Sequence, residues 1–411
     1  MADYELFEFP NGIRLVHKQV FSTKIAHCAV MLDIGSRDEL EHQQGIAHFW
    51  EHMAFKGTKK RKAFHIINRL ESLGGELNAY TTKEKICFYS AVLEKHLDKS
   101  LELLSDITFN STFPEVQIEK ERQVILEEMA MYQDNPEDAI QDQLDTLIYK
   151  NHQLGNNILG TEESVLSFEH EDFKTFIDQN LDTGRLVVSS VGSYSMKKLI
   201  TLVSKYFGDL NSKSSNRERK APDSLSDFTS HVDETRDLSQ AHIGIGRRAY
   251  NIHSELKVPF FFLNNILGGH SFVSRLNLAL RENNAFVYNI DSSFTPLTDT
   301  GYFQIFYATD PSKVKKSLVL VDREFAKLRK TELGKKQLLS AKEQIKGQLA
   351  MSEENNQNYM LMMAKSILDY GKIEPLETVF AKIDSLEAGF LKDLSNEMLN
   401  LDEMSILRYL P

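Results

Sequence analysis

The sequence predicts an α+β protein made of two homologous domains, each a mostly antiparallel sheet with helices packed on one face. The chain has 411 residues, more than a single hydrophobic core usually serves. A polar segment lies almost at its middle, and similar segments occur on both sides of it. We therefore expect a domain over 1–210, a linker over 211–227 and a second domain over 228–411.

The repeat consists of four matches, in three pairs of segments, that occur in the same order in both halves. Each half has a strand-like apolar run, then a Lys-Ser-Leu sequence that opens a helical spacing of apolar residues. Each also has an upstream strand that contains Ala-His and, inside a long helix downstream, a four-residue match that ends in Ala-Met. The paired segments are 25–30 with 240–245, 87–104 with 303–320, and 128–131 with 348–351. A single domain that is regular by coincidence is the alternative.

Composition and charge exclude several classes of protein. The net charge of −11 argues against a nucleic-acid partner and would suit basic peptides, although an ordinary solubility charge explains it as simply. No run of apolar residues is long enough for a membrane span, and no signal peptide is evident. Cys28 and Cys87 lack the Cys-x-x-Cys spacing of a thiolate zinc site. We expect a cytoplasmic protein without disulfides; a periplasmic one with a removed leader stays open.

The segment 45–57 has the apolar spacing of a short helix and carries His-x-x-Glu-His. His48 and His52 are four residues apart and project from one helical face, so both imidazoles can approach one zinc ion to about 2.0–2.1 Å. Glu51 lies on the same side, where it could accept a proton from a water molecule. A surface helix that carries this pattern by accident is the alternative, in a chain with 13 histidines.

A catalytic zinc site needs a third protein ligand and an open position. The helical pattern over 115–129 offers Glu121 and Glu128, which are seven residues apart and share one stripe. The same pattern has other acidic residues, so a solvated charged face is a strong alternative. Spacing alone does not single out Glu128 from its acidic neighbours.

Three segments together resemble the inverzincins, the pitrilysin/insulinase family of zinc peptidases, in the branch that includes mitochondrial processing peptidase. They are 48–58, 73–81 and 121–129, and the resemblance extends over nearly the whole chain. It implies that Glu128 is the third zinc ligand, that Glu121 supports the site and that Glu51 is the general base.

The resemblance also assigns residues outside the metal site. Segment 274–288 is similar to one that completes the family's active site, which implies that Arg281 and Tyr288 stabilise the oxyanion. By residue type alone, a surface arginine and a half-buried core tyrosine would be expected. The substrate is expected to add as an extra strand along an edge strand formed by Asn78, Ala79 and Tyr80.

The sequence departs from the family pattern at a few positions. Trp50 stands where leucine is commoner, and His270 occurs in a loop that normally has small residues. The glycine-rich loop of the non-catalytic processing-peptidase subunit is not evident, so presequence processing is not expected. In the second half, Gln348 and the apolar segment 260–269 offer no zinc ligands.

These observations predict a zinc-dependent metalloendopeptidase that hydrolyses short, extended peptides. The second domain would bind no metal and would complete the active site of the first. Because one chain carries both sets of residues, no separate partner subunit is required, and the resemblance implies a homodimer whose subunits enclose a chamber. A catalytically silent peptide-binding or scaffold subunit would need a broken ligand set. A zinc-stabilised structural protein would need a closed, four-ligand site.

Overall fold

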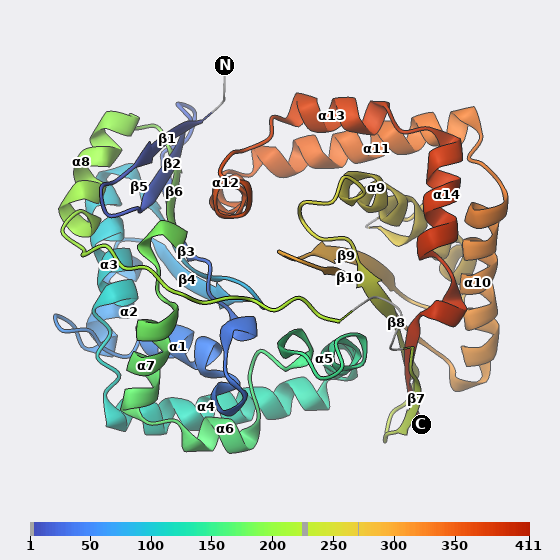
Figure 1. The fold of residues 1–411 in the computed structure, drawn as a ribbon, viewed down its shortest axis with the longest axis horizontal. Coiled ribbons are helices and arrows are strands. Elements are labelled where there is room, and N and C mark those ends of the chain that lie inside the picture. The colour runs from blue at the N-terminus through green and yellow to red at the C-terminus, as the bar shows by residue number, and fades with distance from the viewer. Residues whose placement is uncertain (1–3, 224–228, 270) are drawn as a thin grey trace. The chain divides into compact units, whose positions relative to one another are not determined.

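The computed structural model describes residues 4–223, 229–269 and 271–411, and the chain forms two compact units. The first consists of Met1–Ala130, Asn156–Arg219 and Met351–Pro375, and the second of Met131–Gly155, Lys220–Ala350 and Leu376–Pro411. Each has its own sheet, and the predicted α+β class with two homologous domains is confirmed (Figure 1). In the described part of the chain, every helix is too short or too polar to cross a membrane.

The first unit is built on a six-stranded sheet. Its strands, in spatial order, are β1 (Glu5–Glu8), β2 (Arg14–Gln19), β6 (Leu186–Gly192), β3 (Ile25–Leu32), β5 (Ile86–Leu93) and β4 (Glu76–Thr81). Only the pairing of β2 with β6 is parallel. Among the described residues, strand β4 is therefore paired on one side only and has a free edge on the other.

Helices cover both faces of this sheet. The main hydrophobic core lies between one face and a layer of helices, and a second core lies between the other face and α12 (Asn356–Tyr370). The main layer contains α1 (Ile46–Ala54), α2 (Ala63–Glu71), α3 (Leu97–Phe109), α4 (Glu115–Asp134), α6 (Glu162–Ser167), α7 (His170–Asn180) and α8 (Met196–Phe207). The sequence predicted this layer but assigned no helix to the opposite face.

The second unit repeats this plan. Its strands are, in spatial order, β7 (His231–Thr235), β11 (Ser405–Leu410), β8 (Ala241–Ala249), β10 (Gly301–Thr309) and β9 (Ile290–Pro296), and only β7 with β11 is parallel. The main layer consists of α9 (Lys257–Gly268), α10 (Val314–Lys330), α11 (Lys335–Glu354), α13 (Leu376–Asp384) and α14 (Ala388–Met398). Helix α5 (Pro136–Ile148) covers the other face. Short 3-10 turns lie at 36–38, 41–43, 94–96, 153–155, 183–185, 311–313 and 401–403, and a π-helical turn at Asn277–Glu282.

The repeat found in the sequence corresponds to matching elements. The two Ala-His strands are β3 and β8, and the strand-turn-helix segments become β5 with α3 and β10 with α10. Glu128 and Gln348 are each the fourteenth residue of a 20-residue helix, α4 and α11. An asparagine caps the helix that follows each of them: Asn135 before α5 and Asn355 before α12.

The two units exchange one helix each. Helix α4 begins in the first unit and ends in the second, where α5 packs against β8 and β11. Helix α11 begins in the second unit and ends in the first, where α12 packs against β3 and β6. The prediction of two contiguous halves did not include this exchange, because the amphipathic pattern of a helix does not specify which sheet it covers.

The first part of the predicted linker is bound to the first unit by ion pairs. Arg219 contacts Asp33 at 2.9 Å and Asp38 at 2.8 Å, and Arg217 contacts the same two carboxylates at 3.2 Å. The side chains of Arg217 and Arg219 are 8% and 10% exposed, and that of Asp38 is fully buried. Residues 224–227 of the linker lie outside the described residues.

Replacement of Arg219 by Gln should lower the free energy of unfolding by about 3 kcal/mol, because it removes a charged partner from the buried carboxylate of Asp38 and the partly buried one of Asp33. Urea unfolding measures this loss. Burial alone would raise the pKa of Asp33, but Arg219, Lys85 and Arg217 outweigh it and hold the pKa below its usual value. A depressed carboxyl pKa stabilises the fold above the unfolded pKa of about 3.9, so the difference should shrink as the pH falls through the native pKa.

The control is Lys174→Gln, which removes an exposed ion pair with Glu171. It should change the free energy of unfolding by less than about 1 kcal/mol. An equal effect of the two substitutions at neutral pH would show that the linker is not held by its buried charges.

Candidate metal centre

The start of α1 is fixed by backbone contacts that only glycine permits. Gly45 has φ 92°, in the left-handed region, and a Cβ there would lie 2.4 Å from the carbonyl oxygen of Leu159. The carboxyl oxygens of buried Glu39 accept hydrogen bonds from the N–H groups of Gly45 and Ala47, both at 2.9 Å. Two of the N–H groups that a helix start leaves unpaired are thereby satisfied.

The amphipathic pattern of α1 gives it one buried side. Its predicted apolar residues are all fully buried: Ile46, Phe49, Trp50 and Met53. Trp50 contacts the rings of Phe88 and Phe176 edge-on. His48, Glu51 and His52 therefore sit on a helix whose position is set by the core.

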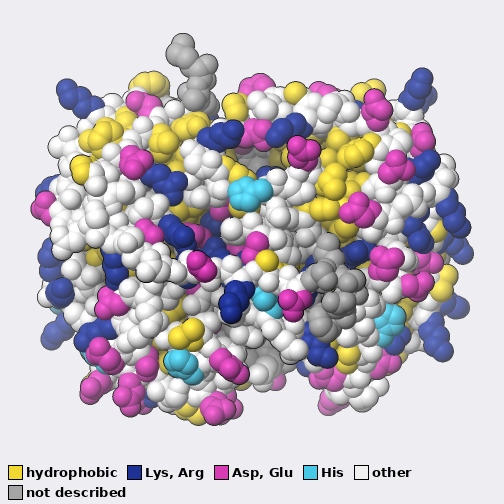
Figure 2. Space-filling model, in the orientation of Figure 1, with side chains coloured by type: hydrophobic (Ala, Val, Ile, Leu, Met, Phe, Trp, Pro, Cys, Tyr) yellow, Lys and Arg dark blue, Asp and Glu magenta, His cyan; other side chains and the backbone are white. Residues whose placement is uncertain are grey.

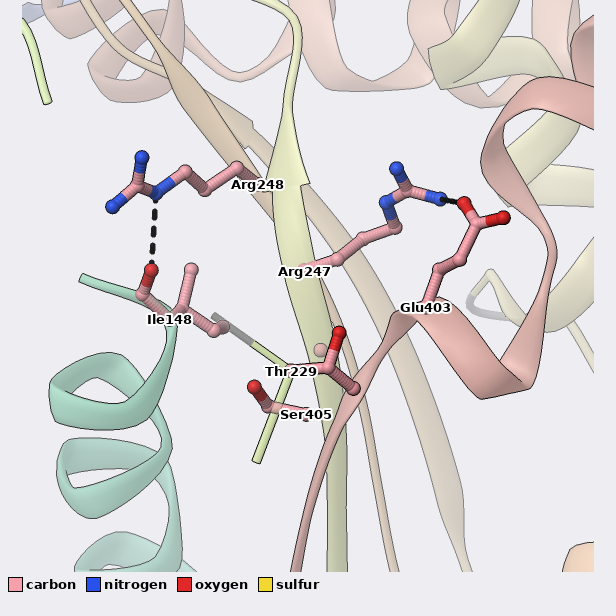
Figure 3. Close-up of a pocket in the computed structure, with 7 residues that line it drawn as sticks. Ile148, Thr229, Arg247, Arg248, Glu403 and Ser405 are labelled. Atoms are coloured by element: carbon pink, nitrogen blue, oxygen red, sulfur yellow. Dashed lines mark hydrogen bonds and ion pairs between the residues drawn. The ribbon is translucent and has the colours of Figure 1, made fainter. Parts of the chain in front are cut away.

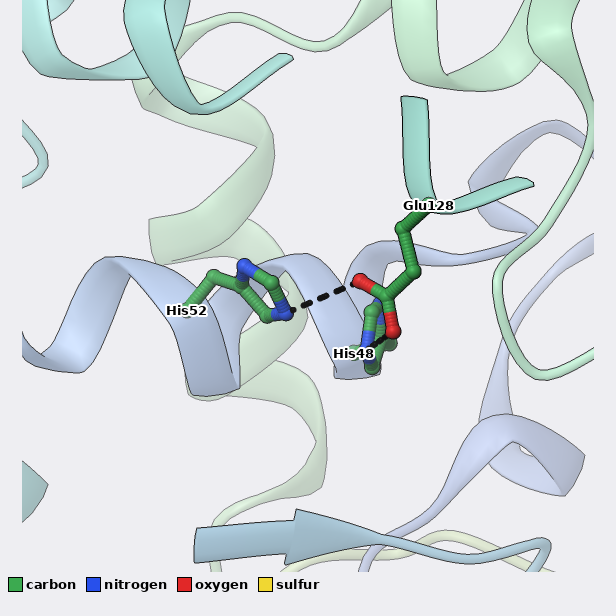
Figure 4. A group of neighbouring side chains, drawn as sticks. All are labelled: His48, His52 and Glu128. Atoms are coloured by element: carbon green, nitrogen blue, oxygen red, sulfur yellow. Dashed lines mark ion pairs between the residues drawn. The ribbon is translucent and has the colours of Figure 1, made fainter. Parts of the chain in front are cut away.

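The two histidines meet Glu128 of α4 (Figure 4). Glu128 Oε1 lies 3.9 Å from His48 Nε2, and Oε2 lies 3.5 Å from His52 Nε2. The three ligand atoms lie within 4.8 Å of one another. Two ligand atoms at about 2.0–2.1 Å from a tetrahedral ion are about 3.3 Å apart, so small side-chain movements bring this set to zinc-binding distances. Two imidazoles and one carboxylate are a fitting donor set for zinc.

His48 is held in the form that binds metal. Its side chain is almost completely buried, and burial, followed by the neighbouring His52, lowers the pKa of His48 to about 3. A neutral imidazole keeps a lone pair for a metal ion. The side chain of Glu128 is 24% exposed, which leaves the centre accessible from the Glu128 side.

Glu121 orients His52. Its Oε1 lies 2.9 Å from His52 Nδ1, and its Oε2 lies 2.6 Å from Lys56 Nζ. Burial would raise the pKa of Glu121, but hydrogen bonds from His52 and Lys56 hold it below the usual value. An ionised Glu121 requires the proton of His52 on Nδ1, which leaves the Nε2 lone pair facing Glu128. Lys56 was not predicted, although its position four residues after His52 placed it on the same helical side.

Replacement of Glu121 by Gln should weaken zinc binding about 10- to 100-fold, the usual effect of removing the partner of a metal-binding histidine. Competition with a fluorescent chelator measures this affinity. Glu119→Gln on the same helix is the control, because the Glu119 side chain is 68% exposed. Wild-type zinc affinity in Glu121→Gln would contradict the role of Glu121.

Glu51 lies beside the metal ligands with its carboxylate fixed. Thr81 Oγ1 donates a hydrogen bond to Glu51 Oε2 at 2.6 Å. Burial raises the pKa of Glu51, and this effect together with repulsion from Glu128 exceeds the opposing effects of Thr81 and His52. A carboxylate with a raised pKa is a better proton acceptor near neutral pH.

The predicted substrate-binding residues lie on the edge strand β4. Ala79 packs against the main core, whereas Tyr80 packs on the face covered by α12. Asn78 Oδ1 accepts a hydrogen bond from the backbone N–H of Ala79 at 2.8 Å. The backbone N–H of Ala79 is thus already hydrogen-bonded to the side chain of Asn78.

Arg281 and Tyr288 lie close together in the second unit. The Arg281 guanidinium lies 5.6 Å from the centre of the Tyr288 ring and 5.1 Å from that of Phe272. Tyr288 is 86% exposed, which excludes the alternative of a half-buried core residue. Their role at the oxyanion stays a prediction.

Among the described residues, His48, His52 and Glu128 are the only cluster of three metal-binding side chains, so the described part of the second unit has none. His270 lies outside the described residues. One cavity of the second unit, of about 30 Å³, is lined by Arg247, Arg248 and Glu403 among others (Figure 3). It has room for only a few water molecules, too little for a substrate. A larger groove of about 660 Å³ includes Glu324, which is ion-paired to Lys327 at 2.5 Å.

Comparison with known proteins identifies the family. Residues 14–162 match the family model "Insulinase (Peptidase family M16)", and residues 167–345 match "Peptidase M16 inactive domain". The chain is 31% identical to an uncharacterized zinc protease of Bacillus subtilis, over 95% of each protein. The chain belongs to the M16 family of peptidases. This agrees with the resemblance seen in the sequence.

Two further proteins are similar to this chain over most of its length. It is 30% identical to the mitochondrial-processing peptidase subunit beta of Bos taurus, over 95% of the chain and 80% of that protein. A protease from Helicobacter pylori has the same fold, with a TM-score of 0.90 over 99% of both chains at 22% identity. Family membership and the names of these relatives support a metallopeptidase. Residues 167–345, which match the inactive-domain model, contain no metal-binding cluster among those that the structure describes.

Proposed function

We propose that this protein is a zinc-dependent endopeptidase that hydrolyses short, extended peptides. The observation that carries the proposal is the convergence of His48, His52 and Glu128 beside Glu51. Three protein ligands with a neighbouring carboxylate are typical of a catalytic zinc site, whereas a structural site usually has four ligands.

In this mechanism the three ligands hold the zinc, and the other residues act on water and substrate. When bound, zinc supplies Lewis-acid chemistry that polarises the scissile carbonyl and lowers the pKa of a water molecule. Glu51 accepts the proton of that water and later delivers it to the leaving amine. Glu121 keeps His52 in the tautomer that presents Nε2.

The free edge of β4 supports the choice of substrate. A peptide that adds to this edge uses main-chain hydrogen bonds, which tolerate many sequences but require an extended conformation. The Asn78 side chain has to release the N–H of Ala79 for a substrate carbonyl to take its place. The net charge of −11 favours basic peptides through long-range attraction. On the face drawn in Figure 2, acidic and basic side chains are interspersed.

Arg281 and Tyr288 are proposed to stabilise the oxyanion, by similarity to the family. Replacement of Tyr288 by Phe removes only a hydroxyl group and should lower kcat about 100-fold with little change in KM, as for the loss of one oxyanion donor. Steady-state kinetics on a quenched peptide measures both constants. Tyr370→Phe is the control, since Tyr370 ends α12, which packs on the face of the sheet opposite to α1 and its metal ligands. A Tyr288→Phe enzyme with wild-type kcat would remove Tyr288 from the mechanism.

Metal analysis combined with hydrolysis of a quenched peptide tests the proposed function. We expect one zinc ion per chain, activity that a chelator removes and activity that added zinc restores. Zinc without hydrolysis would favour the alternative, a silent peptide-binding or scaffold subunit, and protein without zinc would contradict the metal site. The expected homodimer is tested separately by the molar mass that light scattering gives as the protein elutes from a size-exclusion column.

A further inference from the structure

One hydrogen bond joins Glu51, the proposed general base, to β4, the strand to which the substrate is proposed to add. Thr81 is the last residue of β4, and its hydroxyl donates to the Glu51 carboxylate of α1 at 2.6 Å. Within the described residues, no other side chain donates a hydrogen bond to Glu51. The rotamer of the Glu51 carboxylate therefore depends on where β4 ends.

The turn that follows Thr81 is packed against the segment before α1. The backbone N–H of Ser36 donates to the carbonyl oxygen of Thr82 at 3.2 Å, and that of Arg37 donates to Lys83 at 2.8 Å. Gly35 permits this approach, because a Cβ at that position would lie 2.4 Å from the Thr82 oxygen. The end of β4 is thereby fixed by backbone contacts.

Three charged side chains of the turn are buried, which is unusual for Lys-Glu-Lys. Lys83 donates to the carbonyl oxygen of Asn156 at 2.6 Å, Glu84 pairs with Arg37 at 2.7 Å, and Lys85 pairs with Asp369 at 2.6 Å. Each partner comes from a different segment of the first unit. Buried charges are stable only with such partners, so the turn has one well-defined position and Thr81 has little freedom to move.

We infer that Thr81 is a positioning residue for the general base: its hydroxyl holds one oxygen of Glu51 so that the other faces the reacting water. The inference depends on the proposed function, in which Glu51 accepts the proton. Thr81 also ends the strand to which the substrate adds. It therefore sets the position of the Glu51 carboxylate relative to a peptide bound along that strand. Efficient proton transfer requires such fixed geometry.

The test compares three substitutions of Thr81 in the zinc-loaded protein. Thr81→Val keeps the shape without the hydroxyl, Thr81→Ala is a second deletion, and Thr81→Ser restores the hydroxyl. On a quenched peptide, kcat should fall about 10- to 100-fold in the Val and Ala variants and recover in Ser, with KM within about 2-fold of wild type. Zinc content and thermal unfolding should not change. Thr201→Val, on the exposed side of α8, should match the wild type.

Wild-type kcat in Thr81→Val and Thr81→Ala would overturn the inference. Equal losses in Thr81→Ser, or losses of zinc or of thermal stability that parallel those of kcat, would also overturn it by showing a structural role. In a Glu51→Gln background, removal of the Thr81 hydroxyl should not lower the residual rate further. A fully active Glu51→Gln enzyme contradicts the proposed function itself, whereas an inactive one beside a fully active Thr81→Val enzyme contradicts only the role of Thr81.

Discussion

Replacement of Glu51 by Gln should lower kcat about 1000-fold while the protein keeps its zinc. Gln has the shape of Glu but cannot accept a proton, and the three ligand side chains are unchanged. The amide can still accept the hydrogen bond from Thr81, so the surrounding structure should persist. Peptide hydrolysis and metal analysis on the same preparation measure the two quantities.

The control for this substitution is Glu71→Gln. Glu71 is the last residue of α2 and is exposed, so its loss tests only the general effect of one negative charge. It should leave kcat within about 2-fold of wild type. Retained peptidase activity in Glu51→Gln would exclude Glu51 as the general base. Loss of zinc in that variant would indicate that Glu51 supports the metal site instead.

Replacement of Glu128 by Gln should weaken zinc binding by more than about 100-fold and abolish hydrolysis at ordinary zinc concentrations. A neutral amide is a poor zinc ligand, and the remaining two histidines cannot hold the ion as three ligands do. The second unit already has this residue type at the equivalent helical position, Gln348 of α11, and no metal group occurs among its described residues.

Glu127→Gln is the matched control for Glu128. Glu127 is the preceding residue of α4 and is exposed, so the substitution makes the same chemical change one position away. It should leave zinc content and kcat unchanged. Stoichiometric zinc in Glu128→Gln would contradict the ligand assignment. Excess zinc that restores hydrolysis in Glu128→Gln would show that the ligand contributes affinity more than chemistry.

Part of the site follows from local spacing. Residues four apart on a helix share a face, so His48 and His52 converge wherever α1 packs. The apolar pattern of α1 also predicted its buried side correctly. The repeat predicted two similar units because each half carries the same order of strand and helix patterns.

Spacing alone did not show which of Glu121 and Glu128 is the metal ligand. The way α4 crosses α1 gives the two carboxylates different partners. Glu128 faces Nε2 of both histidines, whereas Glu121 reaches Nδ1 of His52 and Lys56. Which end of an imidazole a carboxylate meets depends on the position of one helix against another, and no pattern within either helix encodes it.

The sequence by itself determined the family, the two similar units and the helix that carries His48, Glu51 and His52. The tertiary structure decided the exchange of α5 and α12, the binding of the linker through Arg217 and Arg219, and the contact of Thr81 with Glu51. The physical reason is the range of the interactions. Spacing and periodicity depend on neighbours along one helix or strand, whereas the partner of a buried charge or hydroxyl is chosen by segments that meet only in the folded chain.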